Sequence, residues 1–421
     1  MKFIYCRKDF TKRFCLIISV VLICICFGGC SLLGDLLRDD FKLSTEATEQ
    51  VTNAVSAEAV ETSYSYENIS NEKVKNLYLQ IDSVVSGSDC KEIECTGILA
   101  EKQLFEALTA YKNDHPEVFW LKNTFTYYEY DGISYVTYEF SVTGYELAEK
   151  KEKFTAEVEK IIEMAPMYSS EYERELFVNN YLVDNCYYDE AAAVDDEVIG
   201  HENDAYGAIV EGKAVCEGYA RAFQIICNRV GLDCVCIAGN ADNVGHEWNC
   251  VRINGAWYQV DVTWNDSGEP ACMNDYLNLT DEQMYYDHTP DKLFSEISDE
   301  DYFSSEYLLG NLFLPECDST EYNYYEISSP LLYSFEYENN VEISEALYDA
   351  MLRGDSYFSI MVDENLDFEN ACYTLIDEGY IINYIDYANE MMNYQIEVDS
   401  SACSVYTKDN LRVVTMILSY V

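Results

Sequence analysis

Hydrophobic positions in the middle of this chain change from a helical spacing to strict alternation. An amphipathic helix is predicted first, and its apolar positions are Val215, Tyr219, Ala222, Phe223, Ile226 and Val230. The next two runs, GHEWNCVRI at 245–253 and AWYQVDVTW at 256–264, alternate as half-buried strands do. Asn254-Gly255 between them predicts a tight type I′ hairpin turn, which pairs Ile253 with Ala256.

The predicted hairpin also fixes which residues share a face. Counting outward from the turn places Trp248 opposite Asp261 and His246 opposite Thr263. His246 and Asp261 become diagonal neighbours, about 7–8 Å apart at the backbone. The other face is a core surface made of Val251, Ile253, Tyr258, Val260, Val262 and Trp264. Because a one-residue slip would bury the polar pair and expose that core, the register is well specified.

Further patterns flank this middle segment on both sides. Before it we expect helices at 73–85, 101–112 and 146–164, and a hairpin with strands at 124–130 and 133–142. After it we expect strands at 357–362, 404–407 and 411–420, and helices near 344–352 and 368–378. The predicted fold class is α+β, with a central helix on an antiparallel sheet, a smaller N-terminal α+β domain and a C-terminal α/β sandwich.

Composition changes along the chain suggest its domain boundaries. The expected segments are a leader at 1–29, a flexible tether at 30–70, an N-terminal domain at 71–165, a central core at 166–300, a linker at 301–320 and a C-terminal domain at 321–421. The tether is rich in Thr, Glu, Ala and Ser and shows little periodicity. We interpret the C-terminal domain as a recognition module.

The leader indicates export. It carries Lys2, Arg7, Lys8, Lys12 and Arg13, followed by an apolar run at 14–27 and then Gly28-Gly29-Cys30. This order is typical of a signal peptide, and the apolar run is short for a membrane span. Small residues directly before a cysteine resemble the lipobox of bacterial lipoproteins, which implies lipidation of Cys30 and a place on the outer face of the cytoplasmic membrane. Phe27 departs from that pattern, and an uncleaved signal anchor is the alternative.

Charge narrows the choice of partners. The chain has a formal charge of −51, and 29 residues of predominantly basic leader would be lost on cleavage. Such an acidic body repels nucleic acid and anionic lipid, so we expect no nucleic-acid partner. It leaves cationic substrates and Lys-rich protein surfaces as possible partners, or a role for the charge in solubility outside the cell.

Cysteines and histidines give no sign of a metal or a cofactor. The chain has 17 Cys, and an exported protein with many of them invites a disulfide interpretation, but their scatter is also typical of buried thiols. No two of the four His show metal-ligand spacing, and Cys234 and Cys236 lie too close together for a zinc knuckle. His201 and His288 stand in acidic, loop-like segments, where they are either neighbours of a site or simply exposed.

Three residues in the middle segment have the chemistry of a nucleophilic cysteine site. Cys216 falls in the first turn of the predicted helix, where the helix dipole favours a thiolate. His246 would exchange the proton, and Asp261 would orient its ring. The backbone N–H of Cys216 is one candidate oxyanion donor, Tyr206 is a guess for the second, and Trp248 is a candidate neighbour of the site.

Motifs around these residues resemble the transglutaminase-core superfamily, the papain-like group in which Cys, His and Asp occur in that order. The matching pieces are NCYYD at 185–189, AYGA at 205–208, GKAVCEGYA at 212–220, GHEWN at 245–249, Trp257-Tyr258 and VDVTW at 260–264. The resemblance covers about 171–289. It implies a papain-like α+β core, a triad of Cys216, His246 and Asp261, and acyl transfer through a thioester.

The resemblance leaves the acyl acceptor open. Water would make the chain a peptidase or amidase acting on a protein or peptide, with cell-wall peptides among the candidates. An amine would make it a cross-linking transglutaminase. We prefer hydrolysis, because a site open to about 55 M water needs a dedicated channel to favour an amine, and the sequence shows none. A non-catalytic surface binding module that retains the fold is the alternative of another class.

Overall fold

The computed structural model describes residues 63–87, 92–165, 170–194, 200–268, 272–298, 302 and 310–421. The predicted leader, Cys30 and most of the predicted tether lie outside these described residues. None of the helices in the described ranges combines the length and the hydropathy that a membrane span requires.

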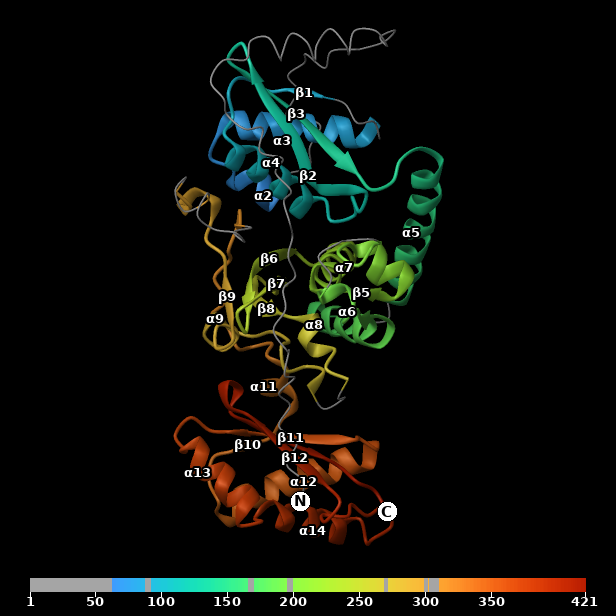
Figure 1. Cartoon of the computed structure of the whole chain (residues 1–421). Helices are drawn as coiled ribbons and strands as arrows, with labels where there is room; N and C mark the ends of the chain where they lie inside the picture. The colour runs from blue at the N-terminus through green and yellow to red at the C-terminus, as the bar shows by residue number, and fades with distance from the viewer. Residues whose placement is uncertain are drawn as a thin grey trace.

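The elements are arranged in three layers that follow the chain (Figure 1). The N-terminal layer holds the helices α2 (Tyr64–Asn68), α3 (Glu72–Gly87) and α4 (Glu101–Asp114) and a sheet of β1 (Ile93–Glu94), β2 (Leu121–Tyr130) and β3 (Ile133–Phe140). Strand order in that sheet is β1-β3-β2. Helix α5 (Gly144–Met164) then descends along one side to the middle layer. The helices and the hairpin expected between 73 and 164 are present within a few residues of the predicted bounds.

The middle layer places one long helix against an antiparallel sheet. It contains α6 (Glu171–Asn185), β4 (Tyr187–Tyr188), the π-helical turn η5 (Gly207–Glu211), β5 (Lys213–Ala214), α7 (Cys216–Arg229), β6 (Cys234–Ala241), β7 (Val244–Ile253), β8 (Ala256–Val260), α8 (Val262–Asn265), α9 (Asp281–Met284) and β9 (His288–Pro290). The four-stranded sheet has the order β8-β7-β6-β9. Apolar side chains of α7 and of β7 meet in one buried cluster, which includes Phe223, Ile226, Val251 and Ile253.

The predicted hairpin register is correct, but its second strand is shorter than expected. Ile253 pairs with Ala256, and pairing continues to Asn249 with Val260. The expected pairing of His246 with Thr263 is wrong, because the chain leaves the sheet after Val260 and begins α8. A carboxylate directly before the helix satisfies its first N–H groups, which favours a helical turn over further strand.

The polar face of the hairpin is also more buried than expected. His246 is 9% exposed and Asp261 is fully buried. Trp248 and Cys250 on the same side of β7 join a second buried cluster, to which Leu411 and Val413 of the C-terminal layer contribute. Burial on both faces of the hairpin therefore fixes the register. The contrast between a polar and an apolar face contributes less to the register than expected.

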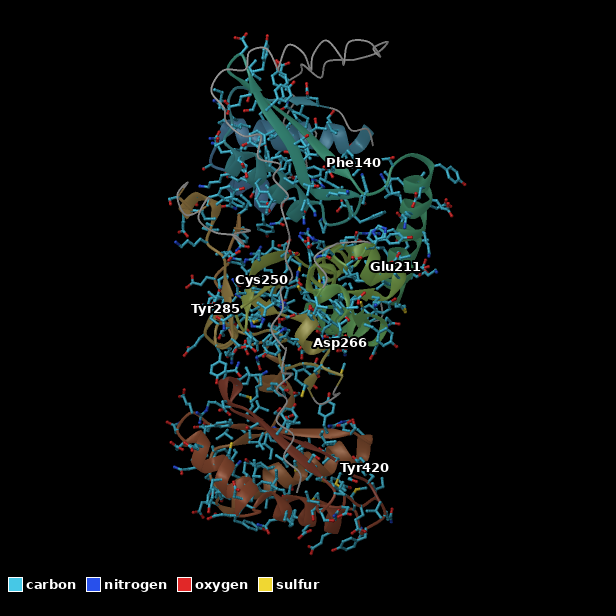
Figure 2. All side chains as sticks on the ribbon, viewed as in Figure 1. Phe140, Glu211, Cys250, Asp266, Tyr285 and Tyr420 are labelled. Carbon is cyan, nitrogen blue, oxygen red and sulfur yellow. The ribbon has the colours of Figure 1, made fainter. Side chains whose placement is uncertain are left out.

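The C-terminal layer is a two-layer α/β sandwich, as expected. Its elements are α11 (Tyr324–Ser328), β10 (Leu331–Leu332), α12 (Tyr337–Arg353), β11 (Tyr357–Val362), α13 (Phe368–Cys372), η8 (Tyr373–Asp377), α14 (Ile381–Met391), β12 (Ser404–Lys408) and β13 (Val413–Ile417). The sheet order is β10-β11-β13-β12, and only the β10–β11 pair is parallel. Helices α12, α13 and α14 cover the face away from the middle layer, so the sheet itself faces the middle layer (Figure 1). Cys250 and Tyr285 lie in the middle layer and Tyr420 in the C-terminal one (Figure 2).

Candidate active site

Cys216 lies at the first position of α7. The residue before it, Val215, has an extended backbone and provides no side-chain cap. The first N–H groups of a helix carry a partial positive charge, so this position favours a thiolate over a thiol. Cys216 is 4% exposed, which also removes it from most of the competing solvent.

His246 lies on β7 and connects the thiol to a carboxylate. Its Nε2 lies 2.7 Å from Oδ2 of Asp261. A hydrogen bond with the Cys216 side chain also acts on the ring, and Nδ1 is the ring nitrogen left to make it. Burial by itself would lower the pKa of His246, but the charges and hydrogen bonds of Asp261 and Cys216 raise it to about 9. The structure thus brings the three predicted residues together in one hydrogen-bonded series.

Asp261 is saturated with donors on both of its oxygens. Oδ1 accepts from the backbone N–H groups of Thr263 at 2.9 Å and Trp264 at 3.1 Å, which caps α8. Oδ2 accepts from His246 and from a second imidazole, the Nε2 of His288 at 3.1 Å. Burial would raise the pKa of this carboxyl, yet the two histidines hold it well below its usual range. The carboxylate is therefore ionised and fixed in orientation.

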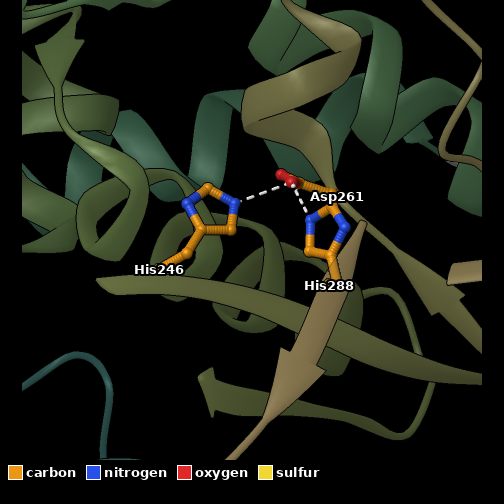
Figure 3. Close-up of side chains that lie close together, drawn as sticks. All are labelled: His246, Asp261 and His288. Atoms are coloured by element: carbon orange, nitrogen blue, oxygen red, sulfur yellow. Dashed lines mark hydrogen bonds and ion pairs between the residues drawn. The ribbon is translucent and has the colours of Figure 1, made fainter. Parts of the chain in front are cut away.

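His288 is the member of this cluster to which the sequence assigned no specific role. It lies at the start of β9, is fully buried, and points at the same carboxylate as His246 from the other side (Figure 3). Its acidic, loop-like segment left two possibilities open, a neighbour of the site or an exposed residue, and the structure shows a buried neighbour of Asp261. The true signal would have been the pairing of β9 with β6, which no local pattern reveals because β9 has only three residues.

Of the other two residues proposed from the sequence, Trp248 lies beside the triad and Tyr206 does not. Trp248 lies beside the site, with its indole 6.2 Å from the His246 ring and nearly parallel to it. Its N–H donates to Oε1 of Gln259 at 2.7 Å, and this hydrogen bond holds the indole in place. Tyr206 is not brought to the triad. Its ring packs on Phe119 and His201, and this packing argues against its use as an oxyanion donor.

A buried ionic cluster joins the residues that directly follow Cys216 and His246. Arg221 lies 3.1 Å from Oε1 of Glu217 and 3.5 Å from Oε2 of Glu247. Glu217 directly follows Cys216, and Glu247 directly follows His246. Arg221 therefore ties the first turn of α7 to β7, and its charge explains why acidic residues are tolerated in the core here. The only sign of this ionic cluster in the sequence was the presence of charged residues inside an otherwise apolar helical pattern.

Gly218 allows the first turn of α7 to pack closely against the segments that contain Ala214 and Glu202, and the position of Cys216 depends on this packing. A Cβ at this residue would lie 2.6 Å from Cβ of Ala214 and 3.0 Å from the carbonyl oxygens of Glu202 and Asp204. We expect Gly218→Ala to shift the first turn of α7 and to cost about 1–3 kcal/mol of unfolding free energy, as overpacking does. Urea unfolding would measure the loss, and a variant as stable as the parent would contradict this close packing.

The triad region also contains the one group of three metal-capable side chains found among the described residues. Ligand atoms of His246, Asp261 and His288 lie within 4.8 Å of one another. The three residues are far apart in the sequence, so the spacing of the histidines along the chain could not reveal this group. The hydrogen bonds of 2.7 and 3.1 Å account for the arrangement without an ion. All eleven cysteines in the described ranges are free thiols.

Comparison with known proteins places a family match over this site. Residues 162–262 match the model of the transglutaminase-like superfamily, and Cys216, His246 and Asp261 all fall inside that range. His288 falls outside it.

Individual relatives are similar over limited segments. The kyphoscoliosis peptidases of Mus musculus and Homo sapiens are 30% and 29% identical over 99 residues, which is 19% of this chain and 15% of each relative. A solved structure of a TGase is 21% identical, with a TM-score of 0.25, over 42% of this chain and 51% of its own. The family assignment rests on the match at 162–262. This chain therefore contains a domain of the transglutaminase-like superfamily.

Proposed function

We propose that this chain is an exported, membrane-anchored cysteine enzyme that transfers acyl groups through a thioester on Cys216. The observation that carries the proposal is the buried hydrogen-bonded series of Cys216, His246 and Asp261, at the start of a helix. Export and lipidation at Cys30 rest on the leader sequence alone.

The geometry supports a two-step reaction. Sγ of Cys216 attacks the carbonyl carbon of an amide, and the C–N bond breaks as His246 gives its proton to the leaving amine. The acyl group then stays on sulfur as a thioester. Water attacks it next, His246 takes the proton of that water, and the thiolate leaves. Asp261 remains ionised throughout and keeps the His246 ring in one orientation.

We further propose that water is the usual acceptor and that the substrate is a protein or a peptide. The curated relatives are named peptidases, which supports hydrolysis. The acidic surface favours substrates rich in Lys or Arg, and cell-wall peptides carrying free amines also fit the proposed location.

An assay with glutamine-bearing peptides, with and without a labelled primary amine, separates the possible reactions. We expect new peptide termini or released ammonia that depend on Cys216, with little incorporation of the amine. Amine incorporation lost in Cys216→Ala would instead identify a cross-linking transglutaminase. Tight peptide binding without any turnover would identify a binding module.

The pKa of His246 predicts the alkaline limit of the reaction. Because that pKa is raised to about 9, the ring holds its proton at neutral pH and loses it as the pH rises through this value. Amide hydrolysis needs this proton for the leaving amine, so we expect its rate to fall above about pH 9. A p-nitrophenyl ester, whose leaving group needs no proton, serves as the control. A limit for the amide near pH 7 would contradict the assignment of His246.

A further inference from the structure

The carboxylate of the triad is the centre of a longer hydrogen-bonded series. Nδ1 of His288 lies 2.7 Å from Oδ1 of Asp287, and the hydroxyl of Tyr276 donates to Oδ2 of Asp287 at 2.7 Å. Nζ of Lys408 donates to that same hydroxyl at 2.8 Å. Lys408 is the last residue of β12, so the series begins in the C-terminal layer and ends at the triad.

The donors and acceptors in this series have only one consistent assignment. Both ring nitrogens of His288 face carboxylate oxygens, which can only accept, so both must donate. His288 is therefore a cation between two anions, Asp287 and Asp261. Since His246 and Cys216 continue the series beyond Asp261, charges alternate along it, which is the arrangement that makes buried charges tolerable.

The surroundings of His288 keep this geometry rigid. Its ring is fully buried and lies 4.6 Å from the ring of Trp264 and 5.1 Å from that of Trp248. The titratable groups that face it are Asp261, Asp287, His246 and Tyr276. Lys408 also lies 3.7 Å from Asp275, whose carboxylate accepts from the hydroxyl of Tyr325.

We propose that His288 is a positioning residue of the active site and that Lys408, through Tyr276 and Asp287, holds it in place. On this basis the C-terminal layer is a structural part of the catalytic apparatus and does more than recognise a partner. The inference deepens the proposed function and rests on it. All three of Tyr276, Asp287 and His288 lie outside the segment that matches the family model.

Alkylation of Cys216 by iodoacetamide in the full chain tests the proposal without a known substrate. The variants are His288→Gln, which keeps a neutral donor toward Asp261, Tyr276→Phe and Lys408→Met. Tyr357→Phe is the matched control, because it removes a hydroxyl of the C-terminal layer that contacts Tyr324 and hydrogen-bonds Asn274 of the middle layer, and it leaves the series intact. Circular dichroism melting confirms that each variant is folded at the assay temperature.

The expected result is a loss of reactivity that depends on pH. At pH 6, where a thiolate forms only with help from His246, we expect rates about tenfold lower for His288→Gln and about threefold lower for Tyr276→Phe and Lys408→Met. At about pH 10 the thiolate forms without that help, so all rates should converge. Tyr357→Phe should match the parent at both pH values.

Each other outcome has a distinct meaning. Parent-like rates at pH 6 in the three variants would overturn this proposal and leave the proposed function intact, as would equal losses at both pH values. Failure of Cys216 to react selectively in the parent would overturn the proposed function and this inference with it. If EDTA changes the alkylation rate, then His246, Asp261 and His288 bind a metal ion, and the proposed hydrogen-bonded series is wrong.

Discussion

Replacing Cys216 with Ala is expected to abolish turnover and to leave the fold intact. The change removes the sulfur that forms the thioester, and loss of a triad nucleophile typically costs about 10⁶-fold in kcat. The side chain is small and lies at a helix start, where Ala is accommodated. We expect a melting temperature close to that of the parent and no acyl-enzyme in mass spectra after incubation with substrate.

Cys227→Ala is the matched control for this prediction. Cys227 is a fully buried thiol in the same helix, and burial raises its pKa. The variant should lose some stability through the cavity it creates, but it should keep its activity. Equal activity in Cys216→Ala and the parent would remove Cys216 from the mechanism.

Asp261→Asn is expected to lower kcat by about 10⁴-fold while leaving α8 in place, as loss of the carboxylate does in other triads. Asn can still accept from the N–H groups of Thr263 and Trp264 through Oδ1, so the helix cap survives. Its amide group, however, would face the Nε2 atoms of His246 and His288, which are donors. The His246 ring would then lose the orientation and the proton placement that the reaction needs.

Asp266→Asn provides a comparison for that variant. Asp266 follows α8 and accepts a hydrogen bond from the hydroxyl of Tyr219 at 2.6 Å, away from the two histidines. We expect its kcat to stay within about threefold of the parent, as for a substitution that leaves the triad untouched. A similar loss in both variants would mean that Asp261 acts through the stability of the region, and its proposed role in orienting His246 would be wrong.

Local sequence signals predicted the scaffold of the site well. The Asn254-Gly255 turn fixed the β7–β8 register, and the apolar spacing placed Cys216 at the start of α7. Both signals act over a few residues, so no knowledge of the remaining fold was needed. Periodicity also located α3, α4, α5 and the β11 strand within a few residues, but α2 falls in the segment that was expected to be a flexible tether.

Long-range contacts were beyond reach of the sequence. His288 lies 27 residues from Asp261, and β9 is held by strand pairing that three residues cannot signal. The end of β8 at Val260 was missed because Asp261 fits a strand alternation and a helix cap equally well, and tertiary packing decides between them. The contact of Lys408 with Tyr276 spans 132 residues and depends on how two layers dock.

In the proposed mechanism, His246 and Asp261 activate Cys216. The most direct test is to treat the folded chain with iodoacetamide at pH 6 and to map the modified thiols by peptide mass spectrometry. We expect Cys216 to react far faster than the ten other thiols in the described ranges, and we expect His246→Gln to remove this advantage. Uniform labelling of the thiols, or selective labelling of Cys216 that survives His246→Gln, would contradict this mechanism.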